Sequence, residues 1–258
     1  MWQRISILTL FITAVAGANF YSLLNFWPLE CQLFFGPSAH QIARAVIPFG
    51  YATAAGVIFV SWGLSILRGA NRELLVISSS LMTAGVGALA AVNQHRRALG
   101  IGMSVLGGFG VGGIIIPAAI ILTIISPDKY IATIAAINLS IRFIGGSIGY
   151  AVYWNIFENK LADVLPALVS AASVAAGLPT SEISGLILNI VNQNKTAIAQ
   201  LPPPIRLAVD EAVKNSYAQG FRKVYLVSIA FGGAAVLASL FLGDIRKYMV
   251  DRVAVDIH

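Results

Sequence analysis

The sequence contains little charge, and this shortage excludes an ordinary soluble protein. Charged residues make up 11% of its 258 residues, against roughly 25% in a typical soluble domain. Hydrophobic residues make up 57%, and the mean hydropathy is +0.80. So apolar a surface is not compatible with water, whereas a bilayer solvates apolar helix faces directly. We therefore expect an integral membrane protein in contact with the lipid bilayer.

Cysteine and histidine are also scarce, which leaves thiol and metal chemistry without a basis. The one cysteine, Cys31, cannot form an internal disulfide and is interpreted as a small packing residue. His40, His95 and His258 lie far apart, without the spacing of metal ligands. The apolar segments contain no nucleophile paired with a base, so we expect no enzymatic activity, no cofactor and no metal.

Six apolar segments are each long enough to cross a membrane, which requires about 20 residues for a hydrocarbon core of about 30 Å. The strands of a membrane β-barrel would instead be about 10 residues long with alternating polarity. We therefore predict an all-α bundle of six transmembrane helices. Their expected ranges are 5–27, 45–67, 74–92, 98–125, 130–157 and 224–243.

The net charge is +6, and the charged residues lie between the apolar segments, so they indicate topology rather than binding to nucleic acid. With the N-terminus inside, and with the long loop at 158–223 left out of the count, the cytoplasmic loops and the tail at 244–258 carry more positive charge than the outer loops. The cytoplasmic set is Arg4, Arg68, Arg72, Lys129, Arg246, Lys247 and Arg252, and the outer set is Arg44, Arg96 and Arg97. Both termini should therefore face the cytoplasm. The same topology places Asn194, in the sequon Asn194-Lys195-Thr196, outside for glycosylation.

Residues 158–223 are too many for a structureless connection, and they carry helical periodicity. Two apolar faces are expected, one formed by Ile183, Leu186, Ile187, Ile190 and Val191, and the other by Ile205, Ala208, Val209, Ala212 and Val213. Prolines 202–204 separate them, and Gly220 is a candidate stop before the last helix. We predict an outer loop of two or three amphipathic helices on the membrane surface, acting as a cap or as a lid over a transport pathway.

The segment 98–125 is rich in glycine. Gly100, Ser104, Gly108 and Gly112 recur every fourth residue and form one smooth stripe, along which another helix can approach closely. Pro117 removes a backbone hydrogen bond and should bend the helix. Static packing and a sliding movement during transport are both compatible with this pattern.

The segment 130–157 carries a cation near its middle. Arg142 at such a depth costs about 2.5 to 3.5 kcal/mol on insertion scales, so it must face protein or water. Asn138 lies one turn earlier on the same face, and Gly145, Gly146 and Gly149 allow a close helix contact. Arg142 is interpreted either as a structural residue bonded within the protein or as part of a substrate or ion pathway.

Acidic residues are expected to be absent from the helix interiors. Glu73, Asp128, Glu158 and Asp244 fall at predicted helix ends, and the other acids fall in loops or the tail. No buried carboxylate is therefore expected to carry a proton. The first helix offers Asn19, Tyr21, Ser22 and Asn25 instead, which line a cavity or form hydrogen bonds between helices.

Six helices with both termini inside match one half of a major facilitator transporter. The run GVGGIIIPAAIILTIISPDKYIATIAAINLSIRFIGGSIGYAVYWNIFENKL resembles the C-terminal half of the fungal trichothecene efflux pump family, a branch that includes siderophore-iron transporters. The resemblance extends from about Tyr21 to Asp244, and SIRFIGGSIG is its most specific part.

This resemblance implies a plasma-membrane protein whose parent activity is proton-coupled efflux of a hydrophobic small molecule, such as a trichothecene toxin or a drug. Family members have an N-terminal half that this sequence lacks, so that half or another transporter half is an expected partner. The antiporter motifs and the proton-binding carboxylates are expected in the absent half. Two alternatives are siderophore-iron uptake, and a non-transporting membrane protein that associates with full-length transporters.

Overall fold

The computed structural model describes residues 2–36, 38–191 and 201–249, and these residues form helices and no strand. The α-helices are α1 (Trp2–Phe34), α2 (Ala39–Ile66), α3 (Asn71–Ala88), α4 (Arg97–Ile125), α5 (Ile131–Ala175), α6 (Thr180–Val191) and α8 (Pro203–Leu240). Single 3₁₀ turns are η1 (Leu89–Ala91), η2 (Asp128–Tyr130) and η3 (Arg246–Tyr248). The predicted all-α fold is confirmed.

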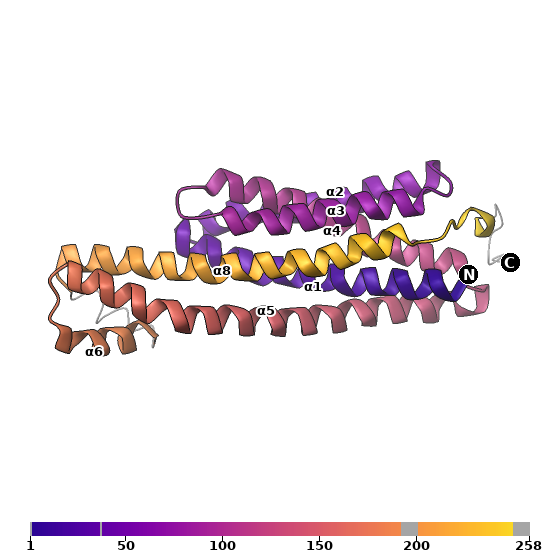
Figure 1. Cartoon of the computed structure of the whole chain (residues 1–258). Helices are drawn as coiled ribbons and strands as arrows, with labels where there is room; N and C mark the ends of the chain where they lie inside the picture. Colours follow the sequence, from indigo (N-terminus) through magenta and orange to yellow (C-terminus); the bar gives the residue numbers. More distant parts are fainter. Residues whose placement is uncertain (1, 37, 192–200, 250–258) are drawn as a thin grey trace.

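Within the described ranges, α1 to α5 and α8 are long and apolar enough to cross a membrane. The start of α1 and the end of α8 lie at the same end of the bundle (Figure 1). There, Arg246 Nε donates a hydrogen bond to the carbonyl of Arg68 over 3.2 Å. At the opposite end, Arg97 donates to the carbonyl of Gln41 over 3.4 Å. Members of the two predicted arginine sets therefore lie at opposite ends, while Arg252 and Asn194 fall outside the described residues.

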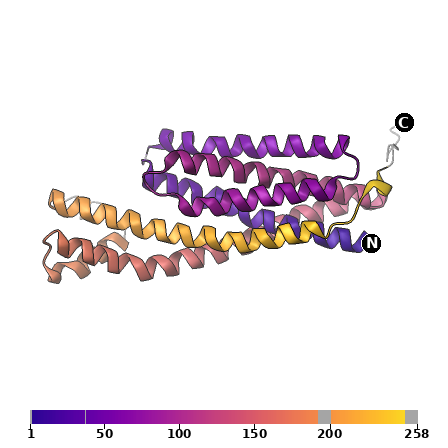
Figure 2. The same cartoon turned by 45° about the horizontal axis from the view of Figure 1, so that its top comes forward.

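The helices form two groups that meet along α1 and where α3 packs against α8. Figures 1 and 2 show α2, α3 and α4 on one side and α5 with α8 on the other. The largest fully buried side chains include Trp27, Phe26, Tyr153, Phe221 and Tyr225, which come from α1, α5 and α8. The core of the bundle follows α1 along its length, from Ile5 to Cys31.

Three helices are longer than the sequence pattern predicted. The helix expected to end at residue 27 continues through Pro28 to Phe34. The helix expected to end at residue 157 continues through Pro166 to Ala175. The last helix begins at Pro203 rather than at residue 224, and Gly220 does not stop it, because Gly220 packs against Phe157 of α5 inside the helix pair.

The extensions of α5 and α8, together with α6, form a helical hairpin that projects beyond α2, α3 and α4 (Figure 1). It has its own apolar core, separate from that of the bundle. The core consists of Leu165, Val169, Leu178, Leu186, Ile205, Val209 and Ala212. The two predicted apolar faces thus exist, but the prediction of separate surface helices is wrong for the second face. That face belongs to α8 and packs against α5 and α6, since burial against another helix removes it from water.

Glycines on α4 allow it to lie directly against α2 and α3. A Cβ atom at Gly112 would collide with the backbone of Thr53 on α2, and one at Gly110 would collide with the backbone of Met82 on α3. At Gly108 the added atom would lie 2.7 Å from Phe49, and at Gly100 it would lie 2.5 Å from Trp27. Such contacts are characteristic of membrane bundles, where small residues let backbones approach closely.

Close contacts at glycine residues also join α5 to α1. Cβ atoms added at Gly145, Gly146 and Gly149 would collide with Ala14, Tyr21 and Ala18, respectively.

Ser104 on α4 is buried and donates to the carbonyl of Ile101 over 2.8 Å, so its hydroxyl is satisfied within its own helix. Pro117 lies inside α4, which continues to Ile125.

Replacing Gly112 by leucine should destabilise the bundle, because the side chain would be forced against the backbone of α2. Overpacking a core typically costs about 1 to 3 kcal/mol, and backbone yields less than a flexible side chain. Gly102, on the same helix, has open space around its Cα, so Gly102→Leu is the matched control. Thermal unfolding in detergent should show a lower midpoint for Gly112→Leu only. Equal midpoints for the two variants would contradict the assignment of this contact.

Candidate substrate-facing surface on α1 and α5

Arg142 lies on α5 at the contact with α1. The backbone carbonyl of Arg142 packs against Gly17, where any side chain would collide with it. The side chain is half-buried, and its guanidinium carbon lies 5.3 Å from the ring centroid of Phe143. Among the described residues the guanidinium has no ion pair. Phe143 therefore provides a cation–π contact, while the charge itself stays uncompensated by an acid.

Tyr21 of α1 lies beside Phe143, the aromatic neighbour of this cation. Tyr21 is half-buried against Gly146, and its ring centroid is 6.1 Å from that of Phe143, which is 46% exposed. Asn25 is exposed one turn further along α1 and donates to the carbonyl of Tyr21 over 2.7 Å. We call Tyr21, Asn25, Arg142 and Phe143 the α1–α5 face. It offers one cation, two aromatic rings and an amide to whatever lies against it.

Asn138 does not join this face, although the sequence placed it beside Arg142. Its side chain is 3% exposed, and its Oδ1 has no hydrogen-bond partner in the described part of the chain. No hydrogen bond connects it to Arg142 among these residues. A buried carbonyl oxygen without a partner costs free energy, so Asn138 is a polar group that this packing leaves unsatisfied.

Asn19 belongs to the interior rather than to an open surface. Its Oδ1 accepts a hydrogen bond from the Tyr153 hydroxyl over 3.2 Å, and its Nδ2 donates to the sulfur of Met82 over 3.7 Å. All three side chains are fully buried, and they come from α1, α5 and α3. The structure therefore favours the interhelical alternative for Asn19. The neighbouring Ser22 is also fully buried, and its hydroxyl has no partner within the described residues.

Sequence reasoning missed Glu30, and the expectation that no acid lies inside a helix is wrong. Glu30 is a fully buried residue of α1, and its Oε2 accepts a hydrogen bond from the Tyr225 hydroxyl over 2.9 Å. The error came from ending the first helix at residue 27, which left Glu30 in a loop. A usable signal was present: Phe26, Glu30 and Phe34 are four residues apart and share one helix face.

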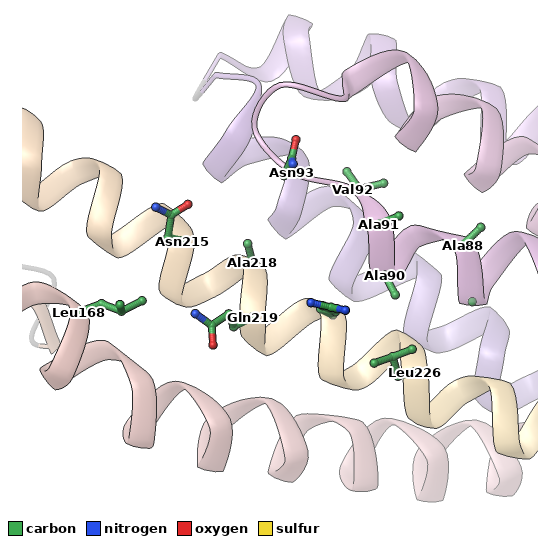
Figure 3. Close-up of a pocket in the computed structure, with 12 residues that line it drawn as sticks. Ala88, Ala90, Ala91, Val92, Asn93, Leu168, Asn215, Ala218, Gln219 and Leu226 are labelled. Atoms are coloured by element: carbon green, nitrogen blue, oxygen red, sulfur yellow. The ribbon is translucent and has the colours of Figure 1, made fainter.

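A groove lies where the projecting hairpin meets the bundle. Its volume is about 600 Å³, and Figure 3 shows Asn93 after η1, Leu168 on α5 and Asn215 and Gln219 on α8 around it. Arg222 also lines it, one turn before Tyr225. The groove is open to the surface and shares no residue with the α1–α5 face.

These features define the class of the protein. Six membrane-length helices, with the start of α1 and the end of α8 at the same end of the bundle, form an integral, multi-pass membrane protein with half of a major facilitator fold.

Comparison with known proteins gives the family. Residues 3–258 match the family described as the fungal trichothecene efflux pump (TRI12), and the chain belongs to it. It is 25% identical to the trichothecene efflux pump TRI12 of Fusarium sporotrichioides, over 95% of this chain and 42% of that protein. It is 26% identical to the TRI12 pump of Trichoderma arundinaceum, again over 95% of this chain and 42% of the relative. It is 24% identical to the MFS-type transporter prx5 of Penicillium rubens, over 97% of this chain and 46% of prx5. The chain thus spans less than half the length of these relatives.

Removing the Tyr153 hydroxyl should destabilise the bundle, because it leaves the Asn19 carbonyl oxygen without its donor. Hydrogen bonds between membrane helices contribute about 0.6 to 2 kcal/mol, so Tyr153→Phe should lower the free energy of unfolding by that amount. Tyr51→Phe is the control, since Tyr51 is 75% exposed on α2. A double-mutant cycle of Tyr153→Phe and Asn19→Leu, measured by denaturant unfolding in detergent, gives the interaction free energy between the two side chains. Strictly additive effects of Tyr153→Phe and Asn19→Leu would show that the two side chains do not interact.

Proposed function

We propose that this chain is the C-terminal half of a proton-coupled exporter of hydrophobic small molecules, trichothecene-like toxins or drugs. The observation that carries the proposal is its match, over nearly the whole chain, to a family of efflux pumps. The relatives reported above are described as efflux pumps or as an MFS-type transporter, and none of them as a siderophore transporter. Export therefore has support that siderophore uptake lacks.

The α1–α5 face is the proposed wall of the substrate pathway. A compact and largely apolar substrate needs aromatic surface for contact and a few polar groups for orientation, and Tyr21, Phe143, Asn25 and Arg142 offer both. In a major facilitator transporter, two halves enclose a site near the membrane midplane. An N-terminal half packed against this face would enclose the pathway and supply a partner for Arg142.

The proposed location is the plasma membrane, with both termini in the cytoplasm. The placement of the termini is supported by the short loops, which carry more Lys and Arg at the end of the bundle that holds the start of α1 and the end of α8 than at the opposite end, with residues 158–223 left out of the count. The hairpin formed by α5, α6 and α8 then projects outside the cell, together with Asn194 as a glycosylation site. The groove in Figure 3 would open on the same side.

A chimaera tests the proposed activity. Residues 1–258 replace the matched segment of the Fusarium sporotrichioides pump, and the product is expressed in a toxin-sensitive yeast. We expect the chimaera to restore toxin efflux and the 258-residue chain alone to give none, because one half provides only one wall of the pathway. Membrane abundance is measured in parallel by immunoblot. A chimaera that is as abundant as the intact relative but exports nothing would overturn the proposal and favour a non-transporting membrane protein.

The role of Arg142 is tested in the same chimaera. Arg142→Lys keeps the charge but loses the planar group that binds a carboxylate through two hydrogen bonds. If the N-terminal half supplies an acid, Arg142→Lys should lower efflux at least tenfold with abundance unchanged, and Arg142→Ala should abolish efflux. Arg72→Lys is the control, since Arg72 is exposed at the start of α3. Parallel losses of abundance and efflux would identify Arg142 as a structural residue, and normal efflux in both variants would remove it from the pathway.

A further inference from the structure

Glu30 lies in an aromatic environment at the outer end of α1. Phe26 and Phe34 flank it one turn before and one turn after on the same helix face. Phe221 of α8 packs against both, with ring centroids 6.4 Å from Phe26 and 6.0 Å from Phe34. The carboxyl group is fully buried, as is Tyr225, the residue on α8 that faces it. Water therefore does not solvate this acid in the conformation described.

The two carboxyl oxygens of Glu30 have different surroundings. Oε2 accepts a hydrogen bond from the Tyr225 hydroxyl over 2.9 Å, whereas Oε1 is buried and has no partner among the described residues. A charged carboxylate is stable in a protein interior only when it accepts several hydrogen bonds or forms an ion pair. Glu30 receives one hydrogen bond from a neutral donor.

No cation forms an ion pair with Glu30 among the described residues. Arg97, on α4, donates to the carbonyl of Gln41, and its guanidinium carbon lies 5.6 Å from the ring centroid of Phe35. Arg222, on α8, is exposed and lines the surface groove. Cys31, beside Glu30 on α1, is buried and offers no positive charge. In the described ranges, Glu30 thus has no ion pair from α1, α4 or α8.

An isolated charge in such a place is far more costly than a neutral acid, so a buried carboxyl without a cation takes up a proton. We propose that Glu30 is a proton-binding site of this chain, protonated on Oε1 and bonded through Oε2 to Tyr225 in this conformation, and that it is the carboxyl that this half contributes to coupling. The last part rests on the function proposed above.

The local structure provides a means of releasing the proton. Pro28, two residues before Glu30, removes one hydrogen bond from α1, which weakens the connection between the last turns of α1 and the rest of the helix. Arg222 and Leu226, which flank Tyr225 on α8, line the groove in Figure 3, so water reaches the adjoining side of this helix. When the end of α1 moves away from α8, the Oε1–H bond breaks, the proton passes to water, and the electron pair stays on the carboxylate. Tyr225 keeps its own proton throughout.

Infrared spectroscopy of the 258-residue chain in lipid nanodiscs tests the protonation directly. At neutral pH we expect the carbonyl stretch of a protonated carboxylic acid, which Glu30→Gln removes and Tyr225→Phe shifts in frequency, because the hydrogen bond to Oε2 is lost. Glu73→Gln should keep the band, since Glu73 is exposed in the first turn of α3. If the band is absent, or is unchanged in Glu30→Gln, the proposed site is overturned, whether or not the protein transports anything.

Efflux by the chimaera tests the coupling. Glu30→Gln should reduce the part of the efflux that depends on the proton gradient to the level seen without a gradient, while Glu73→Gln retains it. Failure of the unmutated chimaera to export would count against the proposed function, and the infrared result would still decide the protonation of Glu30. A protonated Glu30 whose replacement by Gln leaves gradient-dependent efflux intact would overturn the role in coupling.

Discussion

The close approach of α4 to α2 and α3 is the contact on which the rest of the bundle depends. In a bilayer, lipid tails are as apolar as the helix faces, so helices associate through tight packing and hydrogen bonds rather than through removal of apolar surface from water. Gly112 and Gly110 face different neighbours from one helix, and each leaves room for backbone only. This places α2 and α3 on either side of α4.

The position of α1 follows from the same kind of contact. Gly145 and Gly149 of α5 lie against Ala14 and Ala18, and Trp27 fills the space beside Gly100 on α4. The Trp27 indole also donates to the carbonyl of Ala45 on α2 over 3.1 Å. Polar side chains then fix the register: Asn19 connects α1 to α3 and α5, and Glu30 connects it to α8. Small residues determine the distances between helices, and buried polar pairs determine how each helix is positioned along its neighbour.

The sequence was sufficient for the fold because its strongest signals are local. Apolar length identified all six spans, and the stripe on α4 that was predicted for another helix holds Gly108 and Gly112, which lie against α2, and Gly100, which lies against Trp27 of α1. The helix ends are harder to predict, because charged residues such as Glu30 and Glu158 are more typical of loops than of membrane-spanning helices. Both lie inside helices, where Glu30 is buried against Tyr225 and Glu158 stays exposed on α5.

The candidate site could be predicted only in part, because its composition depends on contacts between distant helices. Arg142 was identifiable from its depth alone, since few residue types are so costly there. The sequence does not identify the polar residues that share the α1–α5 face with Arg142. Asn138 and Asn19 look equivalent to Tyr21 and Asn25 in the sequence, yet α1 and α5 turn the first pair inward and leave the second pair at the surface.

Arg142 and Glu30 pose the same electrostatic problem and resolve it differently. Arginine stays charged inside proteins, so Arg142 must find water, an aromatic ring or an acid, and it remains half-buried over Phe143. Glutamate can lose its charge by taking up a proton, so Glu30 can be fully buried with one hydrogen bond. A permanent charge therefore belongs on a surface that another molecule covers, and a titratable one belongs in the interior, where a change in its surroundings alters its proton occupancy. Arg142 on the α1–α5 face and Glu30 between α1 and α8 therefore hold their ionisable groups in separate places, one at a surface and one in the interior.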